Sequence, residues 1–408
     1  MARRTLLVAA TLALVSVAAP ATVGAHPSAQ RRLSRVAAPV ASPPAPSLRG
    51  PREVALGGLL ELHGAAARGE AVRVERRLGD RWRTVGRGRA SGAGRFRVRF
   101  RAPGRSGRLT LRARAGDGSP SRVLRVGVRP LVLAAVGDVN LGDLPGAYVA
   151  RFGAGYPWGS VGPVLRRADL AFANLECAVS RYGRPVRKRF TFRGRPFALR
   201  GARRAGGLDV VNLANNHSGD FGPGALRDTL HWTHRFGIAA VGAGRDAAGA
   251  ARPVVVRRLG LRIAFVGFSD ILPYSFRAGR GRAGTQFATS GAIRSGVRRA
   301  RRHADVVVAT FHWGIERSLV PTPRQRAFAD AALRAGATAV IGAHPHVLQP
   351  IRRSGSRLIA YSLGNFVFGA VSAPTARTGI LLVRLARRGV VGTRFRAARI
   401  VATQPVVR

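Results

Sequence analysis

From Leu131 to the end of the chain, short apolar runs alternate with longer amphipathic segments. The apolar runs predict strands over 131–136, 170–173, 210–213, 238–241, 263–268, 306–309, 339–341, 358–362 and 380–383. Helical periodicity predicts helices near 223–236, 290–303 and 323–335. Because the predicted strands are apolar throughout, we expect their sheets to be covered on both faces. The pattern therefore predicts an α/β domain over 131–408.

Residues 51–130 have a different pattern, in which arginine alternates with an apolar residue. The runs 71–75, 95–100 and 108–112 repeat with the strand period of two, and glycine-rich turns separate them. This predicts a small all-β sandwich that resembles bacterial immunoglobulin-like modules, with Trp82 expected in its core. The segment offers no catalytic cluster. Its role is therefore expected to be either a spacer or an adhesive module for cell wall or polysaccharide.

The first 50 residues precede both patterned regions. Arg3 and Arg4 are followed by an apolar run over 6–19 and by small residues up to Ala25, which predicts a secretory signal peptide over 1–25. The run is short for a membrane-spanning helix, so an uncleaved anchor is the lesser alternative. Residues 26–50 are rich in proline and alanine and predict a linker. We therefore expect a secreted, extracellular protein, free or associated with the cell wall.

Composition narrows the functional classes. The 408 residues carry a formal net charge of +51, and 46% of them are hydrophobic, which excludes a wholly disordered chain. A single cysteine, Cys177, excludes a disulfide scaffold. Nearly all the positive charge is arginine, as a GC-rich genome favours, and it is spread along the chain. This argues against dedicated nucleic-acid binding but predicts attraction to anionic polymers and surfaces.

Polar residues suited to chemistry follow the predicted strands of the α/β domain. Six strands are followed by carboxylates, amides or imidazoles, namely Asp138, Asn174, Glu176, Asn215, Asn216, His217, His312, His344, His346 and Asn365. In open α/β sheets the carboxyl ends of the strands form the ligand-binding edge. We therefore expect these side chains to meet at one edge.

Such a set suits divalent metal ions. Carboxylate, amide and imidazole ligands fit Mn²⁺, Fe or Zn²⁺, and there are enough of them for two neighbouring ions. Two ions can activate water and hold a phosphoryl group. Each residue also has a plainer interpretation: Asp138 as a turn cap, Glu176 as an ion-pair partner of arginine, and the histidines as hydrogen-bonded core residues.

Six segments also occur in a characteristic order: Gly137-Asp138, Asn174-Leu175-Glu176, Ala214-Asn215-Asn216-His217-x-x-Asp220-x-Gly222, His312-Trp313-Gly314-x-Glu316, Gly342-Ala343-His344-Pro345-His346 and Tyr361-Ser362-Leu363-Gly364-Asn365-Phe366. Together they resemble the CapA family, proteins associated with poly-γ-glutamate capsule synthesis. That family is similar to calcineurin-like metallophosphoesterases. The resemblance covers about 131–370 and implies an α/β/β/α sandwich of two stacked sheets flanked by helices.

The resemblance also implies metal ligands. One metal would be held by Asp138, Glu176 and His346. Glu176 would bridge to a second metal, held by Asn216, His312 and His344. The chain departs from the phosphoesterase pattern at two positions, because Asn140 stands where histidine is usual and Glu176 stands where aspartate is usual. The first metal site is therefore expected to be either weaker or absent.

Four further residues receive roles from the same resemblance. His217 would be an acid or an electrostatic stabiliser beside the substrate, oriented by Asp220. Asn365 and Glu316 would line the substrate pocket. These roles predict a metal-dependent hydrolase, phosphoesterase-like, acting on a phosphoester or an anionic polymer such as polyglutamate. The alternative is a non-catalytic protein that binds or assembles an anionic envelope polymer.

Overall fold

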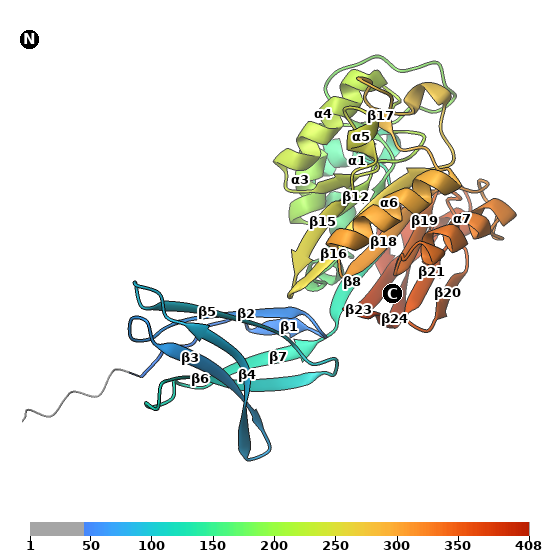
Figure 1. Cartoon of the computed structure of the whole chain (residues 1–408). Helices are drawn as coiled ribbons and strands as arrows, with labels where there is room; N and C mark the ends of the chain where they lie inside the picture. The colour runs from blue at the N-terminus through green and yellow to red at the C-terminus, as the bar shows by residue number, and fades with distance from the viewer. Residues whose placement is uncertain (1–44, 408) are drawn as a thin grey trace, which may run out of the picture. The chain divides into compact units, whose positions relative to one another are not determined.

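The structure is a computed structural model that describes residues 45–407 (Figure 1). The predicted signal peptide over 1–25 and most of the predicted linker over 26–50 lie outside the described residues. Within residues 45–407, no helix combines the length and apolar composition needed to cross a bilayer.

The N-terminal part of the described chain is all-β, as the alternating pattern predicts. A five-stranded sheet has the order β1 (Glu53–Ala55), β7 (Leu124–Arg129), β6 (Gly107–Ala115), β3 (Ala71–Leu78), β4 (Arg81–Arg89). A second sheet pairs β2 (Leu59–Ala65) with β5 (Arg95–Arg101). Apolar side chains from both sheets share one core, including Leu62, Val74 and Val98. The resemblance to immunoglobulin-like modules stays a prediction.

The expectation that Trp82 lies in this core is wrong. Its indole is half-buried on β4, and the Arg112 guanidinium lies 4.0 Å from the ring centroid. Val85, three residues further along β4, packs against the core. Because successive side chains of a strand point to opposite faces, a residue three positions away faces the other side. Trp82 is therefore an outward-facing residue covered by arginine.

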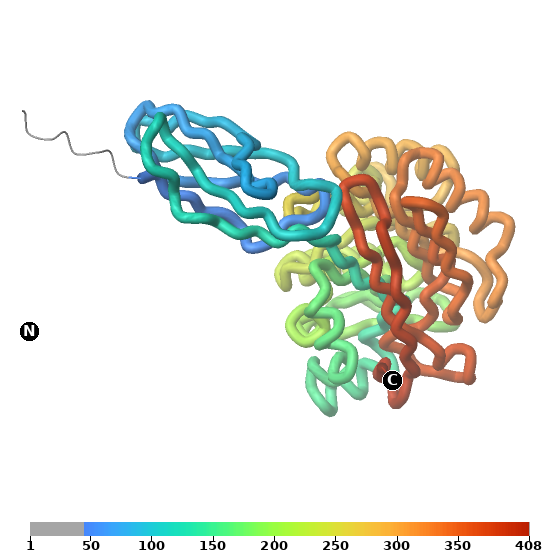
Figure 2. Tube along the Cα trace, turned by 90° about the horizontal axis from the view of Figure 1, so that it is seen from below, coloured from blue at the N-terminus to red at the C-terminus, as the bar shows by residue number. Residues whose placement is uncertain are grey.

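The α/β domain begins with β8 (Leu131–Val139), the central strand of an eight-stranded sheet. On one side lie the parallel strands β9 (Leu170–Leu175), β12 (Val210–Asn212) and β13 (Ala239–Val241). On the other lie β23 (Arg377–Ala386), β24 (Gly389–Val401) and β25 (Gln404–Val407), all antiparallel to their neighbours. The short strand β22 (Asn365–Val367) also pairs with β8. Figure 2 shows β23 and β24 as a long hairpin in the red part of the trace.

A six-stranded sheet forms the second layer, in the order β15 (Val254–Arg258), β16 (Leu261–Ser269), β18 (Val306–His312), β19 (Ala339–Ala343), β21 (Arg357–Ala360), β20 (Ile351–Ser354). The four inner strands are parallel to one another. Phe172 of the first sheet stacks on Phe265 of the second, with ring centroids 5.7 Å apart. The two sheets therefore enclose a common core.

Helices cover the outer faces of both sheets (Figure 1). The eight-stranded sheet is covered by α1 (Asp143–Phe152), α2 (Gly162–Arg167), α3 (Pro196–Arg204) and α4 (Gly222–Arg235). The six-stranded sheet is covered by α6 (Ser290–His303) and α7 (Pro323–Arg334). This is the predicted α/β/β/α sandwich. Every predicted strand and helix of the domain is present, with bounds shifted by a few residues.

Candidate metal centre at the carboxyl edge of the two sheets

The candidate ligands meet at one edge because both sheets direct their parallel strands toward it. Asp138 lies near the end of β8 and Glu176 directly follows β9. His312 is the last residue of β18 and lies in the other sheet. The side chains of these three residues are completely buried. The topology thus brings together residues that are far apart in the sequence, as the strand-end pattern predicts.

Two groups of residues place one ligand atom each within 4.8 Å of one another. The first consists of Asp138, Glu176 and His312, and the second of Glu176, His344 and His346. Glu176 belongs to both groups, which is the position a bridging carboxylate needs. The grouping of the histidines differs from the expected one, because His312 lies with Asp138 and His344 lies with His346. Asp138 Oδ2 is nevertheless only 3.5 Å from His346 Nδ1, so the two groups adjoin.

The donor set fits divalent cations. Within residues 45–407, neither carboxylate oxygen of Glu176 has a hydrogen-bond partner, and neither does Nδ1 of His344, although all three atoms are buried. Buried polar atoms are normally paired, so these three atoms lack a partner that a cation would supply. Carboxylate oxygens and neutral imidazole nitrogens are the usual ligands of Mn²⁺, Fe and Zn²⁺.

Burial sets the protonation of the cluster without metal. Desolvation lowers the pKa of His344 to about 3 and holds that of His312 well below its ordinary value. Both imidazoles are therefore neutral, the form that binds metal. Desolvation, reinforced by the neighbouring Asp138 carboxylate, raises the pKa of Glu176 well above its ordinary value. The charge of Glu176 thus costs free energy that a bound cation would offset.

The loop after β19 presents the two histidines of the Gly-Ala-His-Pro-His segment. His344 and His346 both have positive φ angles, +98° and +58°, which non-glycine residues rarely adopt. Their ring centroids lie 5.8 Å apart. The His344 N–H donates to Asp138 Oδ2 at 3.3 Å, which anchors the loop to β8. The unusual backbone thus places both rings at one cluster, and such strain is typical of functional sites.

Asn174 connects the ligands of the two sheets. Its Nδ2 donates to Asp138 Oδ1 at 2.8 Å and lies 3.3 Å from His312 Nδ1. Its Oδ1 accepts from Asn212 Nδ2 at 3.0 Å. Residues that hydrogen-bond to metal ligands fix their orientation and are part of a working site. Asn174 follows the strand-end pattern, but no role could be predicted for it from the resemblance.

His217 and Asn216 follow β12 and reach the cluster from the first sheet. His217 Nδ1 lies 2.7 Å from Asp220 Oδ2, so Asp220 orients the imidazole in the expected way. The ring stacks on Phe192 with centroids 4.2 Å apart. Asn216 Oδ1 lies 2.7 Å from His312 Nε2, which places the amide next to a candidate ligand. His217 is thus held rigidly beside the metal cluster.

Lys188, the only lysine in the sequence, also belongs to the site, although it was not among the predicted site residues. Its Nζ donates to the backbone oxygen of Asn216 at 2.6 Å and to Asp220 Oδ1 at 2.7 Å. It also lies 3.1 Å from His217 Nδ1. A compact ammonium can serve several acceptors that converge on one point, whereas the planar fork of arginine cannot. A single lysine among 69 basic residues was the sequence signal that could have identified it.

The remaining expected site residues have other contacts. Asn365 Oδ1 lies 2.8 Å from His346 Nδ1, so this amide positions a candidate ligand, and its role in a substrate pocket stays a prediction. Glu316 is exposed on the loop after β18. Asn140 is buried, and its Oδ1 accepts from the N–H of Gly142 at 2.8 Å. The position where phosphoesterases usually have histidine therefore forms a turn at the start of α1.

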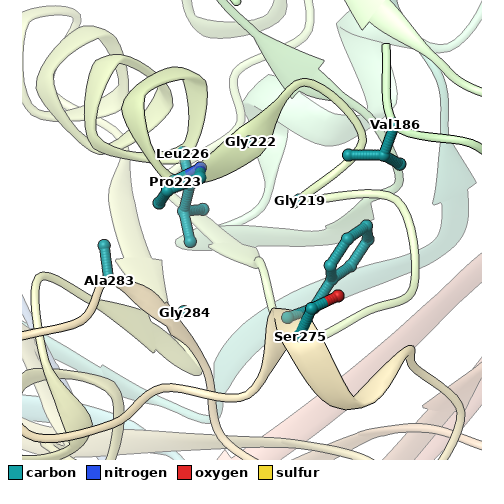
Figure 3. A pocket seen from close by; sticks show the side chains of 9 residues that line it. Val186, Gly219, Gly222, Pro223, Leu226, Ser275, Ala283 and Gly284 are labelled. Atoms are coloured by element: carbon teal, nitrogen blue, oxygen red, sulfur yellow. The ribbon is translucent and has the colours of Figure 1, made fainter. Parts of the chain in front are cut away.

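A small apolar cavity of about 100 Å³ lies beside the His217–Asp220 turn (Figure 3). It is lined by Val186 from one loop, Leu226 from α4 and Phe276 from a third segment. A Cβ atom at Gly219 would lie 2.6 Å from the Phe276 ring, so the turn requires glycine there. No proposed metal ligand lines this cavity, which is therefore separate from the metal cluster.

Two stacked sheets between helical layers, with a carboxylate and histidine cluster at their shared carboxyl edge, define a metallophosphoesterase-like domain. Sequence comparison identifies the family. The family model described as "Bacterial capsule synthesis protein PGA_cap" matches residues 132–370, more than half of the chain, and the chain belongs to this family. The predicted resemblance to CapA proteins is confirmed.

Individual relatives agree with the family. The chain is 30% identical over 282 residues to the "PGA biosynthesis protein CapA" of Bacillus subtilis (strain 168), which covers 67% of this chain and 73% of that protein. It is 32% identical over 246 residues to the "Capsule biosynthesis protein CapA" of Bacillus anthracis, covering 58% and 60%. A "Probable polyglutamine synthesis accessory protein" of Mycobacterium tuberculosis is 31% identical over 229 residues, covering 52% and 59%.

Proposed function

We propose that the protein is a metal-dependent hydrolase that acts outside the cell on a phosphoester or on an anionic polymer such as polyglutamate. The observation that carries the proposal is Glu176, a completely buried carboxylate with no hydrogen-bond partner among residues 45–407. Its nearest nitrogens belong to two other candidate ligands, His312 at 3.5 Å and His346 at 3.8 Å. Glu176 lies between two groups of potential ligands. A structural carboxylate in such a position would be expected to have an arginine or N–H partner.

The residues around the cluster suit hydrolysis. Divalent metal ions bound there would supply Lewis acidity toward a phosphoryl or carbonyl oxygen. Asp220 holds His217 in one orientation through Nδ1, and Lys188 in turn holds Asp220, so that the imidazole can hold or transfer a proton at the edge of the cluster. His346, whose side chain is 17% exposed, provides the access that the completely buried ligands lack.

The substrate class follows from charge and from the relatives. Two relatives are named for PGA or capsule biosynthesis and one for polyglutamine synthesis. The formal net charge of +51 attracts anionic polymers electrostatically. The proposed setting is therefore the metabolism of an anionic capsule or envelope polymer, which the protein would meet after secretion.

One observation favours a second candidate, a non-catalytic protein that binds or assembles the same polymer. Asn140 stands where the phosphoesterase pattern has histidine, and its side-chain oxygen is used by Gly142. This leaves the Asp138 site one ligand short. A site that binds metal weakly would still retain the arginines and amides that a polyanion needs.

Metal content and turnover together test the proposal. Purified protein should bind divalent metal after incubation with Mn²⁺ or Zn²⁺, measured by elemental analysis, and should release phosphate from phosphoesters or fragments from poly-γ-glutamate. Glu176→Ala should lose metal from both groups, whereas His344→Ala should lose it mainly from one. Absence of bound metal in the wild-type protein would refute the hydrolase. Metal without turnover on either substrate class would favour the binding protein.

A further inference from the structure

Four loops surround the metal centre at the carboxyl edge of the sheets. They follow β10 (Ala178–Val179), β16, β18 and β22, and they cover residues 180–192, 270–283, 313–322 and 368–372. We call these four loops the rim. Loops 180–192 and 270–283 meet at the apolar cavity, which Val186 of the first loop and Ser275 and Phe276 of the second line. Figure 3 shows Val186 and Ser275 at this cavity. Figure 1 shows both loops at the upper edge of the domain.

The other two loops join the same ring. Phe368 packs edge-on against Phe192 with centroids 5.8 Å apart, and it lies 5.1 Å from the ring of His346. The N–H of Arg317 donates to the oxygen of Pro345 at 2.8 Å, between the two histidines of that loop. Loops 313–322 and 368–372 therefore lie beside His346, the partly exposed candidate ligand, and loop 180–192 reaches them through Phe192.

The rim carries most of the large apolar side chains that are more than half exposed. Among residues 45–407, nine large apolar side chains are more than half exposed. Seven of these nine belong to the rim: Tyr182, Phe190, Tyr274, Ile315, Leu319, Val320 and Val371. Scattered exposed apolar residues need no explanation, but a concentration around one opening marks an interaction surface.

Unpaired positive charge accompanies these apolar side chains. The rim contains eight arginines: Arg181, Arg184, Arg187, Arg189, Arg277, Arg280, Arg282 and Arg317. Its two acidic residues are Asp270, which pairs with Arg324 at 2.7 Å, and Glu316. None of the eight arginines forms an ion pair with a residue of 45–407. Arg277 is partly buried and stacks on Phe287 at 3.5 Å. The other seven arginines are exposed and free to meet anionic groups of a partner.

We propose that the rim is a docking surface for a phospholipid bilayer that contains anionic lipid. Interfacial membrane binding combines exposed aromatic and aliphatic side chains with arginine, because the former enter the headgroup region and the latter bind lipid phosphates. Arg189 lies 5.0 Å from the Phe190 ring, which places both kinds of group at one point. A soluble polyanion would bind the arginines but would leave the seven apolar side chains in water.

Docking in this orientation directs the opening at His346 toward the lipid headgroups. The protein would then act on material at the membrane surface, such as a polymer that emerges there or a headgroup-linked precursor. This inference goes beyond the proposed hydrolysis, because docking requires no turnover. A vesicle assay therefore tests docking separately from the proposed activity.

A dye at one position of the full-length chain reports which face docks. Val371→Cys carries an environment-sensitive NBD dye on the rim, and Val391→Cys, near the start of β24, carries it away from the rim. The native Cys177 is completely buried and burial raises its pKa to about 12, so it should stay unlabelled. With vesicles containing 30% phosphatidylglycerol, we expect the NBD fluorescence at position 371 to rise at least twofold and to shift to the blue. The dye at position 391 should not change. An N-terminal apolar segment that binds lipid by itself would not produce this difference.

Charge variants provide a second readout. Each arginine near an anionic surface contributes roughly a fivefold factor in partitioning, so Arg187→Gln/Arg189→Gln should weaken vesicle binding about 25-fold. The matched control is Arg298→Gln/Arg302→Gln on α6, which should change it little. The proposal is overturned by an unchanged dye at 371, by equal responses at both positions, or by equal binding to neutral vesicles. The proposal is also overturned if the dye at 371 responds to detergent-solubilised membrane protein but not to lipid, because the rim would then bind a protein partner.

Discussion

Replacing Glu176 with glutamine should stabilise the metal-free protein and abolish its response to metal. The substitution keeps the shape of the side chain and removes its charge. Both carboxylate oxygens of Glu176 are buried without a hydrogen-bond partner among residues 45–407, and Asp138 is a neighbouring carboxylate. A glutamine amide carries no charge to desolvate, and it can donate to that neighbour. The native Glu176 is therefore expected to lower the stability of the metal-free protein and to be retained because it binds metal.

The magnitude follows from the burial of the group. Leaving a buried polar group unsatisfied costs about 1–3 kcal/mol, and more for a charged group. We expect Glu176→Gln to gain about 2 kcal/mol without metal, which corresponds to roughly 4–8 °C in melting temperature for a domain of this size. Saturating metal at about 100 times its dissociation constant should add about 2.7 kcal/mol to the wild-type protein. Without metal the glutamine variant should therefore have the higher melting temperature, and with saturating metal the wild-type protein should have it.

The pH dependence has a definite sign. The pKa of Glu176 is raised in the folded protein, so its contribution to stability is present below its ordinary value of 4.5 and lost as pH rises through the folded-state pKa. The advantage of the glutamine variant should therefore grow with pH and vanish in acid. Calorimetric melting with EDTA and with Mn²⁺ measures both effects, and Asp117→Asn, at an exposed position before β7, is the control. If Glu176→Gln melts below the wild-type protein in EDTA, or gains equally from Mn²⁺, the reasoning fails.

Three further predictions concern residues around the cluster. Lys188→Met should leave the buried Asp220 carboxylate without its ammonium partner and lower the free energy of unfolding in urea by about 3–5 kcal/mol, and Lys188→Arg should not restore it. A loss no larger than that of replacing an exposed arginine would contradict this prediction. Because burial lowers the pKa of His344 to about 3, metal-free protein should lose stability as pH drops from 6.5 toward 3. His344→Gln should flatten this part of the plot of unfolding free energy against pH, and parallel plots for the two proteins would count against the prediction. Gly219→Ala should cost about 1–3 kcal/mol because its Cβ would lie 2.6 Å from the Phe276 ring, and unchanged thermal melting would show that the ring can move.

The strands of the α/β domain could be predicted because each is apolar at consecutive positions and long enough for a buried strand. β24 was missed because Arg394, Arg396 and Arg399 interrupt its apolar pattern, and an antiparallel strand toward the edge tolerates polar residues on its exposed face. Helix α3 was missed because Gly201 lies inside a short segment that carries three arginines. Trp82 was misplaced because alternation alone does not say which of two faces is buried.

The candidate site was predictable as far as it depends on strand ends. Their common edge follows from parallel topology, so Asp138, Glu176 and His312 could be placed together from sequence. The grouping of the histidines depends on the backbone of the loop after β19, where His344 adopts a positive φ angle that the sequence does not reveal. Lys188 depends on a long loop that folds back onto the His217 turn, a tertiary contact that no local pattern encodes.

The solitary lysine has a practical consequence for chemical probing. A reagent specific for primary amines has one side chain to modify in the whole chain, besides the terminal amine. The Lys188 amine is held by Asn216 and Asp220, so its acylation or reductive methylation requires the surrounding loop to open first. An endoproteinase specific for lysine has likewise one bond to cut, between Lys188 and Arg189. The rate of either reaction on the folded protein therefore reports how often loop 180–192 lifts from His217, and ligands bound beneath it should slow that rate.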